Sequence, residues 1–194
     1  MDDLYAICLM TGASGKDATA LYADPKLIGH IYAAPYVVLN GCISYVAEDQ
    51  EGVLGYAVGA PDTRTFERLL ETDWWPRLRP AYPNPTGDRN TWSPDELRAR
   101  MIHHPQPVPN DIVGDYPAHI HMNLLPRARG KGVGTRLLEA WMETARAENV
   151  PAVHAGVGAS NQSGLKFWSA RGFRSVRTDP ANGSNGTIWT GRFL

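Results

Sequence analysis

Apolar positions along the chain recur with two spacings, and each spacing predicts one kind of element. Alternating or continuous apolar runs predict strands at residues 36–47, 53–60, 119–125, 152–157, 173–178 and 187–193. A spacing of three to four residues predicts helices at residues 4–10, 63–71, 133–148 and 161–171, with a short one at 17–22. The order of these elements predicts an α/β (α+β) fold in which helices flank a mixed sheet.

The helix predicted at residues 133–148 carries its apolar side chains on one stripe, which is typical of a helix packed on a sheet. The stripe consists of Val133, Leu137, Leu138, Trp141, Met142 and Ala145. A strand precedes this helix and another follows it, so we expect a right-handed βαβ unit with parallel strands. Side chains alternate along the first of these strands. Its polar face holds His119, His121 and Asn123.

A segment rich in proline and tryptophan, residues 61–117, separates the first predicted hairpin from the βαβ unit. Its clearest helix begins at Ser93-Pro94, because serine caps a helix and proline suits the first helical position. The tryptophans need burial, so we expect an ordered insertion rather than a linker. For most of its aromatic residues a small satellite core is the favoured role, and the alternative is an acceptor pocket. The candidates for acceptor contact are Trp74, Trp75 and Tyr116.

The most informative motif, Arg129-Gly130-Lys131-Gly132-Val133-Gly134, joins the strand to the helix. Glycines at a helix start leave backbone N–H groups approachable. These donors, the helix dipole and the nearby cations favour a phosphate group. The spacing differs from a Rossmann fingerprint, which needs a glycine where Thr135 stands, and Gly15-Lys16 lacks the other residues of a P-loop. The alternative is an ordinary glycine-rich helix start.

The ordered set of strand, R-x-x-G-x-G loop, helix, strand, Asn161, helix and Gly172-Phe173 resembles the GNAT superfamily of acetyl-CoA-dependent N-acetyltransferases. The resemblance covers about residues 124–173 and implies a strongly twisted sheet. It implies one domain over residues 1–194, with 61–117 as an insertion and 118–178 as the acetyl-CoA-binding core. The loop would hold the coenzyme A diphosphate, and the preceding strand end would pair with the pantetheine arm. The implied acetyl-CoA contacts are Asn123, Leu124, Leu125, Arg127, Arg129, Gly130, Lys131, Gly132, Val133, Gly134, Thr135, Asn161 and Trp168.

Acetyl transfer to an amine needs a group that removes a proton, because a free lysine-type amine has a pKa of about 10.4. His121 and His119 are the first candidates and Asp115 is the second, since imidazole titrates near neutrality. Two alternatives stay open: the histidines are hydrogen-bonded interior groups, or they bind a metal. A His-x-His pair without a nearby third ligand is a weak zinc signal, so we expect no metal.

One position departs from the pattern that the resemblance implies. The family usually has a tyrosine acid where this chain has Trp168, and an indole cannot give up its proton in this way. Further pieces of sequence resemble bacterial relatives of the acetyltransferase-like C-terminal domain of O-GlcNAcase. These are Ile7-Cys8, Thr11-Gly12, Gly15, Trp74-Trp75-Pro76 and Tyr116-Pro117.

Two functions therefore remain open. The first is an N-acetyltransferase that acts on a primary amine of a small molecule, peptide or protein. The second is a catalytically weak or inactive relative that binds acetyl-CoA and serves as an interaction or regulatory module.

Composition and charge limit the classes of partner and the location that we expect for this protein. The net charge of −1 argues against a nucleic-acid partner, while the excess of Lys and Arg in residues 124–177 suits an anionic cofactor. No run approaches a membrane span, no secretory signal is visible, and Cys8 lies far from Cys42, so we expect a cytoplasmic protein. The strand that usually opens the family fold does not precede the helix at residues 4–10. Either this strand is absent, or the numbered sequence starts after it, or a partner chain fills the edge. A homodimer that fills this edge is therefore one of our expectations.

Overall fold

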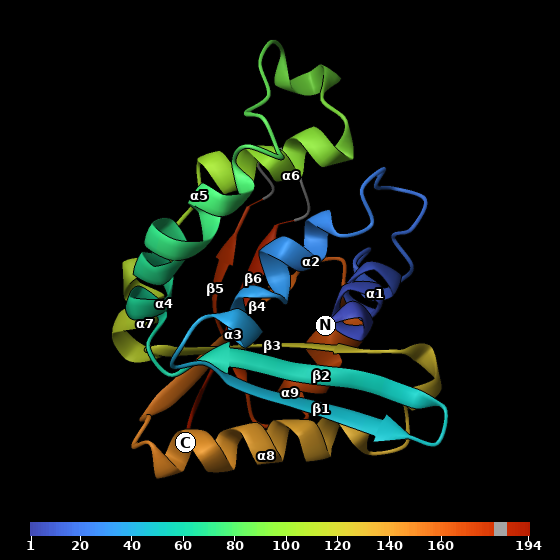
Figure 1. The fold of residues 1–194 in the computed structure, drawn as a ribbon. Helices are drawn as coiled ribbons and strands as arrows, with labels where there is room; N and C mark the ends of the chain where they lie inside the picture. Colours follow the sequence, from blue (N-terminus) through green and yellow to red (C-terminus); the bar gives the residue numbers. More distant parts are fainter. Residues whose placement is uncertain (181–185) are drawn as a thin grey trace.

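The computed structural model describes residues 1–180 and 186–194, and within them six strands form one mixed sheet (Figure 1). The strands are β1 (Ile43–Asp49), β2 (Gly52–Ala60), β3 (Ala118–Leu124), β4 (Ala152–Gly158), β5 (Arg174–Asp179) and β6 (Thr187–Phe193). Their order is β1-β2-β3-β4-β6-β5, and only β3 and β4 are parallel. The expected mixed sheet and its parallel βαβ unit are confirmed.

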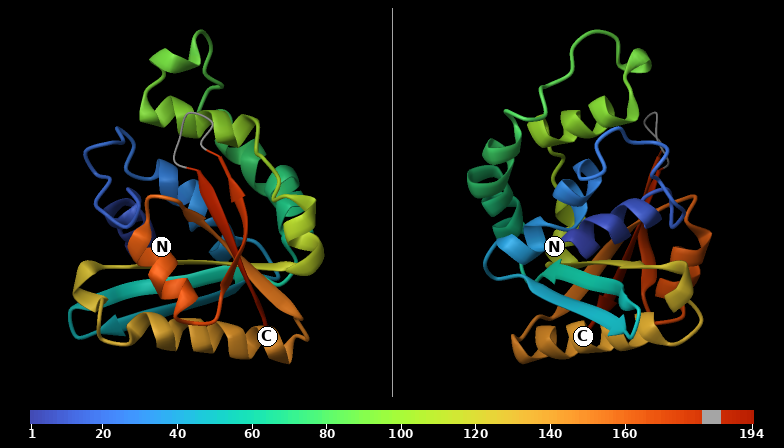
Figure 2. Two further views of the ribbon diagram at one scale, coloured as in Figure 1. Left: turned by 180° about the vertical axis from the view of Figure 1, so that it is seen from behind. Right: turned by 45° about the vertical axis from the view of Figure 1, so that its right-hand side comes forward.

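Helices cover both faces of this sheet. They are α1 (Asp2–Thr11), α2 (Leu27–Tyr32), α3 (Pro35–Val38), α4 (Thr63–Leu69), α5 (Trp75–Leu78), α6 (Pro94–His103), α7 (Asn110–Asp115), α8 (Val133–Ala147) and α9 (Gln162–Ser169). A π-helical turn, Leu70–Trp74, joins α4 to α5, and 3-10 turns span Arg89–Thr91 and Pro126–Ala128. In Figure 1, α8 lies below the sheet and α1, α2 and α3 lie above it; Figure 2 shows the same two layers from behind.

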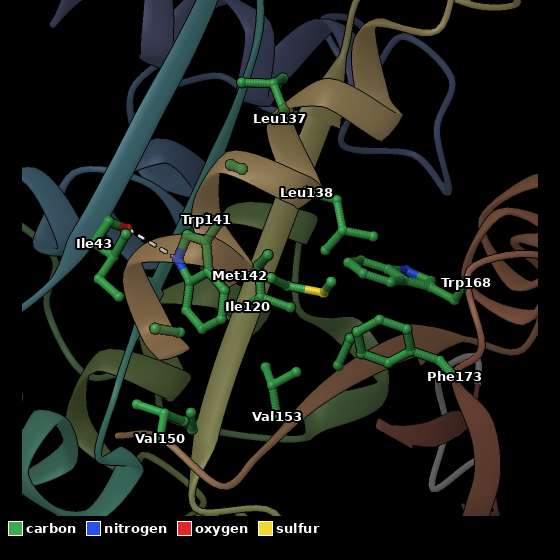
Figure 3. Packing of buried hydrophobic residues seen from close by; sticks show 14 of the residues in the cluster. Ile43, Ile120, Leu137, Leu138, Trp141, Met142, Val150, Val153, Trp168 and Phe173 are labelled. Atoms are coloured by element: carbon green, nitrogen blue, oxygen red, sulfur yellow. Dashed lines mark hydrogen bonds between the residues drawn. The ribbon is translucent and has the colours of Figure 1, made fainter. Parts of the chain in front are cut away.

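The α8 face of the sheet holds the main apolar core (Figure 3). Trp141 is fully buried at its centre, and its indole Nε1 donates a hydrogen bond to the Ile43 carbonyl oxygen at 3.2 Å. Trp168 and Phe173 extend the core toward α9 and β5, with ring centroids 4.7 Å apart. Every residue of the predicted α8 stripe is buried, so that prediction is confirmed.

The opposite face of β2 and β3 is covered by α1, α2 and α3. A second cluster lies between them, built on Leu4, Ile7 and Cys8 of α1 and on Tyr56 and Val58 of β2. Partly buried tyrosines border this cluster: Tyr22, Tyr32 and Tyr36. Polar aromatic side chains therefore replace aliphatic ones where this layer meets the sheet.

The insertion forms its own small core against α2. Trp74 and Trp75 pack there with Leu27, Ala34 and Ile102, as predicted by the favoured interpretation of a small satellite core. Helix α6 begins with a complete capping box, in which Ser93 Oγ accepts from the Glu96 N–H and Glu96 accepts from the Ser93 N–H. The insertion is thus ordered structure that rests on α2.

Two predicted elements were wrong. No helix forms at residues 17–22, because Asp17 Oδ1 accepts from the Thr19 N–H at 2.8 Å and from its hydroxyl at 2.6 Å, a local turn that competes with helix. The run at residues 36–47 begins as α3, with Pro35 at its first position, and becomes a strand only at Ile43. In both places a local side-chain or proline effect outweighs the apolar pattern.

Helix α1 begins at Asp2, and β1 pairs with β2 alone in the described part of the sheet. Tyr45 and Val46 on this edge strand are exposed. The turn-rich segment that joins the last two predicted strands, residues 180–186, lies mostly outside the described residues. None of the described helices has both the length and the apolar character needed to span a bilayer.

Candidate active site

The site begins where β3 and β4 part. Their ladder has two register pairs, Ala118 with Val153 and His119 with His154. Beyond these pairs β3 runs on to Leu124 and β4 to Gly158, with no ladder between them. Backbone groups along the two facing edges are therefore available to an extended chain that enters the gap, as in strand addition.

The glycine-rich loop lies at the end of β3. Gly130 and Gly132 have left-handed backbone angles, with φ of 74° and 73°, which glycine adopts without steric cost. Gly132 is the N-cap of α8 and provides no side-chain cap. The first N–H groups of this 15-residue helix are thus left without a side-chain acceptor, as the sequence predicted for a phosphate site.

The basic residues of the loop differ in whether their side chains already form ion pairs or hydrogen bonds. Arg127 Nη1 pairs with Asp49 at 2.6 Å and lies 3.8 Å from Glu51, so its charge is held at the β1–β2 turn. Arg129 Nη2 donates to the Gly15 carbonyl oxygen at 2.5 Å, which ties the loop to the end of α1. Lys131 is exposed and forms no ion pair among residues 1–180 and 186–194. Lys131 is therefore the cation with the greatest freedom to reach a phosphate.

The remaining predicted contacts flank the same end of the gap. Gly134 lies against α9, where an added Cβ would come within 3.1 Å of the Phe167 ring. Thr135 Oγ1 accepts from the Arg171 guanidinium. Asn161 Oδ1 accepts from the Gly164 N–H at 2.9 Å and so caps α9. Trp168 is buried in the apolar core, so the residue that aligns with the family tyrosine serves as packing.

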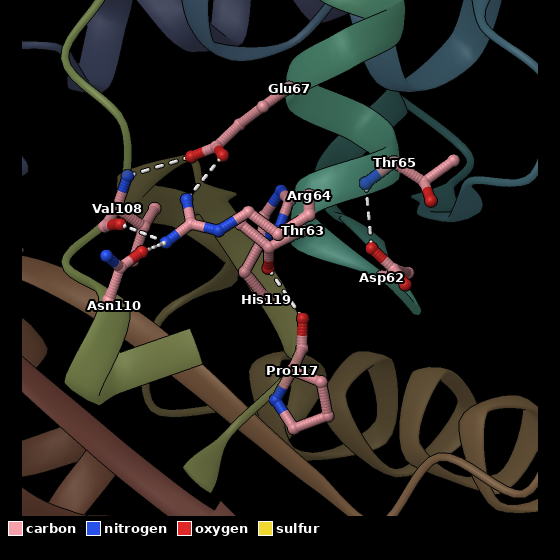
Figure 4. A network of polar contacts seen from close by, with 9 residues as sticks. All are labelled: Asp62, Thr63, Arg64, Thr65, Glu67, Val108, Asn110, Pro117 and His119. Atoms are coloured by element: carbon pink, nitrogen blue, oxygen red, sulfur yellow. Dashed lines mark hydrogen bonds and ion pairs between the residues drawn. The ribbon is translucent and has the colours of Figure 1, made fainter. Parts of the chain in front are cut away.

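Both ring nitrogens of His119 are hydrogen-bonded, one to Thr63, which lies beside it in Figure 4, and the other to Tyr36. Thr63 Oγ1 donates to the Pro117 carbonyl oxygen at 2.7 Å, so it accepts from His119 Nδ1 at 2.9 Å. His119 Nε2 then accepts from the Tyr36 hydroxyl at 2.9 Å. Arg64 and Glu67 hold this end of α4 against Val108, at 2.8 Å each. This pattern uses the only lone pair of a neutral His119 ring, as the interior-group alternative predicted.

His121 differs from His119, because its Nε2 is buried without a hydrogen-bond partner. Burial lowers the pKa of His121 to about 4, partly offset by the Asn123 side chain. Burial and the neighbouring His154 and His121 lower the pKa of His119 to about 3. Both rings are therefore neutral at pH 7, and of these two rings only that of His121 has a buried nitrogen without a hydrogen-bond partner.

His154 is a third histidine at the point where the strands part, and the sequence analysis did not single it out. Its ring lies 5.8 Å from that of His119, and its Nδ1 donates to the Tyr116 carbonyl oxygen at 2.7 Å. Its Nε2 is buried without a partner. A histidine inside a strand otherwise made of Val, Ala and Gly was the signal that could have found it.

Four buried side-chain nitrogen and oxygen atoms in the described part of the chain lack a hydrogen-bond partner, and all belong to this region. They are Tyr56 Oη, His121 Nε2, Asn123 Oδ1 and His154 Nε2. Native interiors satisfy most such atoms, so a cluster of them indicates room for a polar ligand or bound water. Asn123 Nδ2 is already engaged with Thr11 Oγ1.

The structure brings some predicted residues to this site and leaves others away from it. Asp115 is exposed at the end of α7. Trp74 and Trp75 lie in the satellite core, where Trp74 Nε1 donates to the His30 carbonyl oxygen at 2.8 Å. Tyr116 packs against β6, with its ring 5.3 Å from that of Phe193, and reaches the site through its carbonyl.

A sheet that parts beside the bare start of a helix is the architecture of acetyl-CoA-dependent acetyltransferases. The chain belongs to the acetyltransferase (GNAT) family, whose family model matches residues 21–173. It is also similar to O-GlcNAcase of Rattus norvegicus, with 21% identity over 150 residues. The match covers 77% of this chain and 16% of the rat protein, so the chain spans a small part of that relative.

Solved structures agree with this assignment. SsHAT is 31% identical, with a TM-score of 0.86 over 99% of this chain and 92% of that one. YncA of Salmonella typhimurium, solved with its cofactor acetyl-CoA, is 16% identical, with a TM-score of 0.54 over 99% of this chain and 85% of that one. The expected acetyltransferase fold is confirmed, and one protein of the same fold carries acetyl-CoA.

Proposed function

We propose that this chain binds acetyl-CoA and transfers the acetyl group to a primary amine. The observation that supports this most is the parting of β3 and β4 after His119, next to the uncapped start of α8. A parted parallel pair leaves a strand edge for an amide-containing arm, and the helix start favours its diphosphate. One ligand that carries both groups would satisfy both features.

The residues present fit such a ligand. Arg129, Lys131 and the N–H groups after Gly130 would hold the diphosphate, while the end of β3 at Asn123–Leu125 would pair with the arm. The unpaired buried atoms of His121 and Asn123 lie on the strand that would carry the acetyl end. Polar atoms buried without a partner are costly, and a ligand that bonds to them removes part of that cost.

Acetyl-CoA, once bound, would supply the acetyl carbon: the amine nitrogen would bond to it, the carbon–sulfur bond would break, and coenzyme A would leave as its thiolate while the amine loses a proton. The chain's own residues do the rest. His121 Nε2 accepts a hydrogen bond from the amine and orients its lone pair. Since the pKa of His121 is lowered to about 4, the ring passes the proton to water rather than keeping it. Backbone N–H groups at the end of β3 would stabilise charge on the carbonyl oxygen.

The second candidate function is an acetyl-CoA-binding module without turnover. Trp168 supports it, because the position of the family tyrosine is filled by a buried indole that cannot protonate the leaving thiolate. His119 and His121 are also weak bases, because burial lowers the pKa of each ring. The two candidates share the binding step and differ only in whether an amine is acetylated.

The first experiment measures acetyl-CoA binding by calorimetry for the wild type and for Gly132→Glu. A side chain at φ 73° is strained, and the new carboxylate repels the diphosphate. We expect an affinity loss of about 100-fold or more, equivalent to at least about 2.8 kcal/mol. Gly87→Glu is the matched control, since Gly87 has φ 84° and nothing within 4 Å. Absence of binding in the wild type, or equal loss in both variants, would overturn the proposal.

A second experiment separates the two candidate functions. Thiol release from acetyl-CoA is followed on a panel of amines with the wild type and His121→Ala. Release that depends on an amine and falls at least tenfold in the variant supports transfer. Binding without release on any amine supports the module.

A further inference from the structure

Arg98 is a cation that the site described above does not use. It lies on α6, which packs over α2 in Figure 1. The Arg98 guanidinium contacts two tyrosines. Its Nε donates to Tyr22 Oη at 3.1 Å, and its Nη1 donates to Tyr32 Oη at 3.0 Å and to Met101 Sδ at 3.3 Å. No carboxylate pairs with Arg98 in residues 1–180 or 186–194. A partly buried guanidinium without an anion is costly, because desolvation is not repaid by an ion pair.

The groups around Arg98 have more donors than acceptors. Its Nη2 forms no hydrogen bond with the described residues. The Tyr22 hydroxyl accepts from Arg98, and its own proton has no acceptor among those residues. The Tyr32 hydroxyl also accepts from Arg98, and the only acceptor for its own proton among those residues is the Met101 thioether, at 3.6 Å. Burial raises the pKa of Tyr32, so its hydroxyl stays protonated and does not neutralise Arg98. A site of this kind is completed by an anion with several acceptor oxygens.

The Tyr32 ring connects the Arg98 donors to the gap between β3 and β4, because it neighbours His121 on β3. The Tyr32 ring neighbours both Arg98 and His121: the Arg98 Cζ lies 5.6 Å from its centroid, and the His121 ring centroid lies 6.2 Å from it. His121 presents its unpaired Nε2 near the place where we expect the acetyl group. A small molecule lying along Tyr32 could therefore reach both His121 and Arg98.

We propose that the acceptor is a small amine that also carries a carboxylate, and that Arg98 Nη2 and the Tyr22 and Tyr32 hydroxyls bind this carboxylate while the amine faces His121. The inference rests on the proposed function and names its substrate class. A carboxylate is favoured because its two oxygens match the planar fork of a guanidinium. Without this role, Arg98 would only tether α6 to α2.

The experiment measures acceptor binding directly, so that it does not depend on turnover. ω-Amino acids of increasing chain length and their carboxamides are titrated calorimetrically into the protein, with and without acetyl-CoA. We expect the acids to bind about 10- to 100-fold more tightly than the matched amides. Arg98→Gln should remove this preference while leaving the affinity for acetyl-CoA unchanged.

Arg100→Gln is the matched control on the same helix, because Arg100 Nη1 donates to Asn84 Oδ1, away from the tyrosines. This variant should keep the preference. Tyr22→Phe, which leaves the guanidinium in place, should weaken acid binding several-fold and serves where Arg98→Gln fails to fold.

Equal affinity for acids and amides, or an unchanged preference in both Arg98→Gln and Tyr22→Phe, would overturn the carboxylate proposal. Acetyl-CoA binding would then still stand. Absence of acetyl-CoA binding in the wild type would instead refute the proposed function. The failure of the carboxylate proposal and the failure of the proposed function are therefore distinguishable.

Discussion

The two faces of the central sheet bury different kinds of side chain. The α8 face is covered by aliphatic and aromatic side chains around Trp141, Leu138 and Val153. In the described part of the chain, these side chains leave no buried polar atom without a hydrogen-bond partner. The α1–α3 face buries His119, His121 and Tyr56 instead, and the unpaired buried polar atoms of the described chain are all on this side. Each such atom costs about 1–3 kcal/mol. The comparison indicates that one face stabilises the fold and that the other carries the polar groups of the candidate site at the expense of stability.

The largest expected effect tests the stabilising face. Trp141→Ala removes a fully buried indole and its hydrogen bond to Ile43, leaving a cavity under β1 and β2. We expect the free energy of unfolding to fall by about 3–5 kcal/mol. Urea unfolding monitored by circular dichroism measures this change. Trp92→Ala, in the insertion, should cost much less, and similar losses in the two variants would contradict the division between the faces.

The second effect tests the polar face through pH. The pKa of His121 is about 4 in the folded chain, below the 6.5 of an ordinary histidine side chain, so the unfolded chain binds this proton first as pH falls. Stability present at pH 7 is therefore lost between pH 6.5 and 4, by on the order of 2–3 kcal/mol for His121. His121→Gln should make that part of the stability profile less steep, with the remaining slope due to buried His119, and the exposed His104→Gln should leave it unchanged. A wild-type profile without a slope in this window would contradict buried, neutral histidines.

The smallest expected effect concerns the helix that carries Arg98. Ser93→Ala removes one half of the α6 capping box and should lower the free energy of unfolding by about 1 kcal/mol. Thermal unfolding detects it, with the exposed Ser175→Ala as the control. A loss of several kcal/mol would mean that α6 is as essential to the fold as α8, and the division between the two regions would fail.

Local patterns predicted some parts of this molecule well. The α8 stripe, the alternation along β3 and the glycine loop follow from spacing within one or two turns of chain, and each has the predicted place. The short helix at residues 17–22 was wrong, because one Asp17 side chain satisfies the backbone locally. The start of the first strand was wrong because Pro35 begins a helix instead.

Long-range packing decided the rest of the candidate site. His119 and His121 looked equivalent in sequence, yet Thr63 and Tyr36 occupy both nitrogens of one ring and leave the other ring free. His154 and Arg98 come from distant segments and join the site only through the parallel pair and through α2. No sequence spacing could have related them.

By itself, the sequence determined the alternation of its elements, the glycine-rich helix start and the family to which the chain belongs. These depend on backbone geometry and side-chain periodicity, which neighbouring residues fix. Only the tertiary structure decided which polar side chains are buried without partners and which cation lacks an anion. Burial and pairing are properties of contacts between distant segments, and those contacts exist only once the sheet and its two helical layers have assembled.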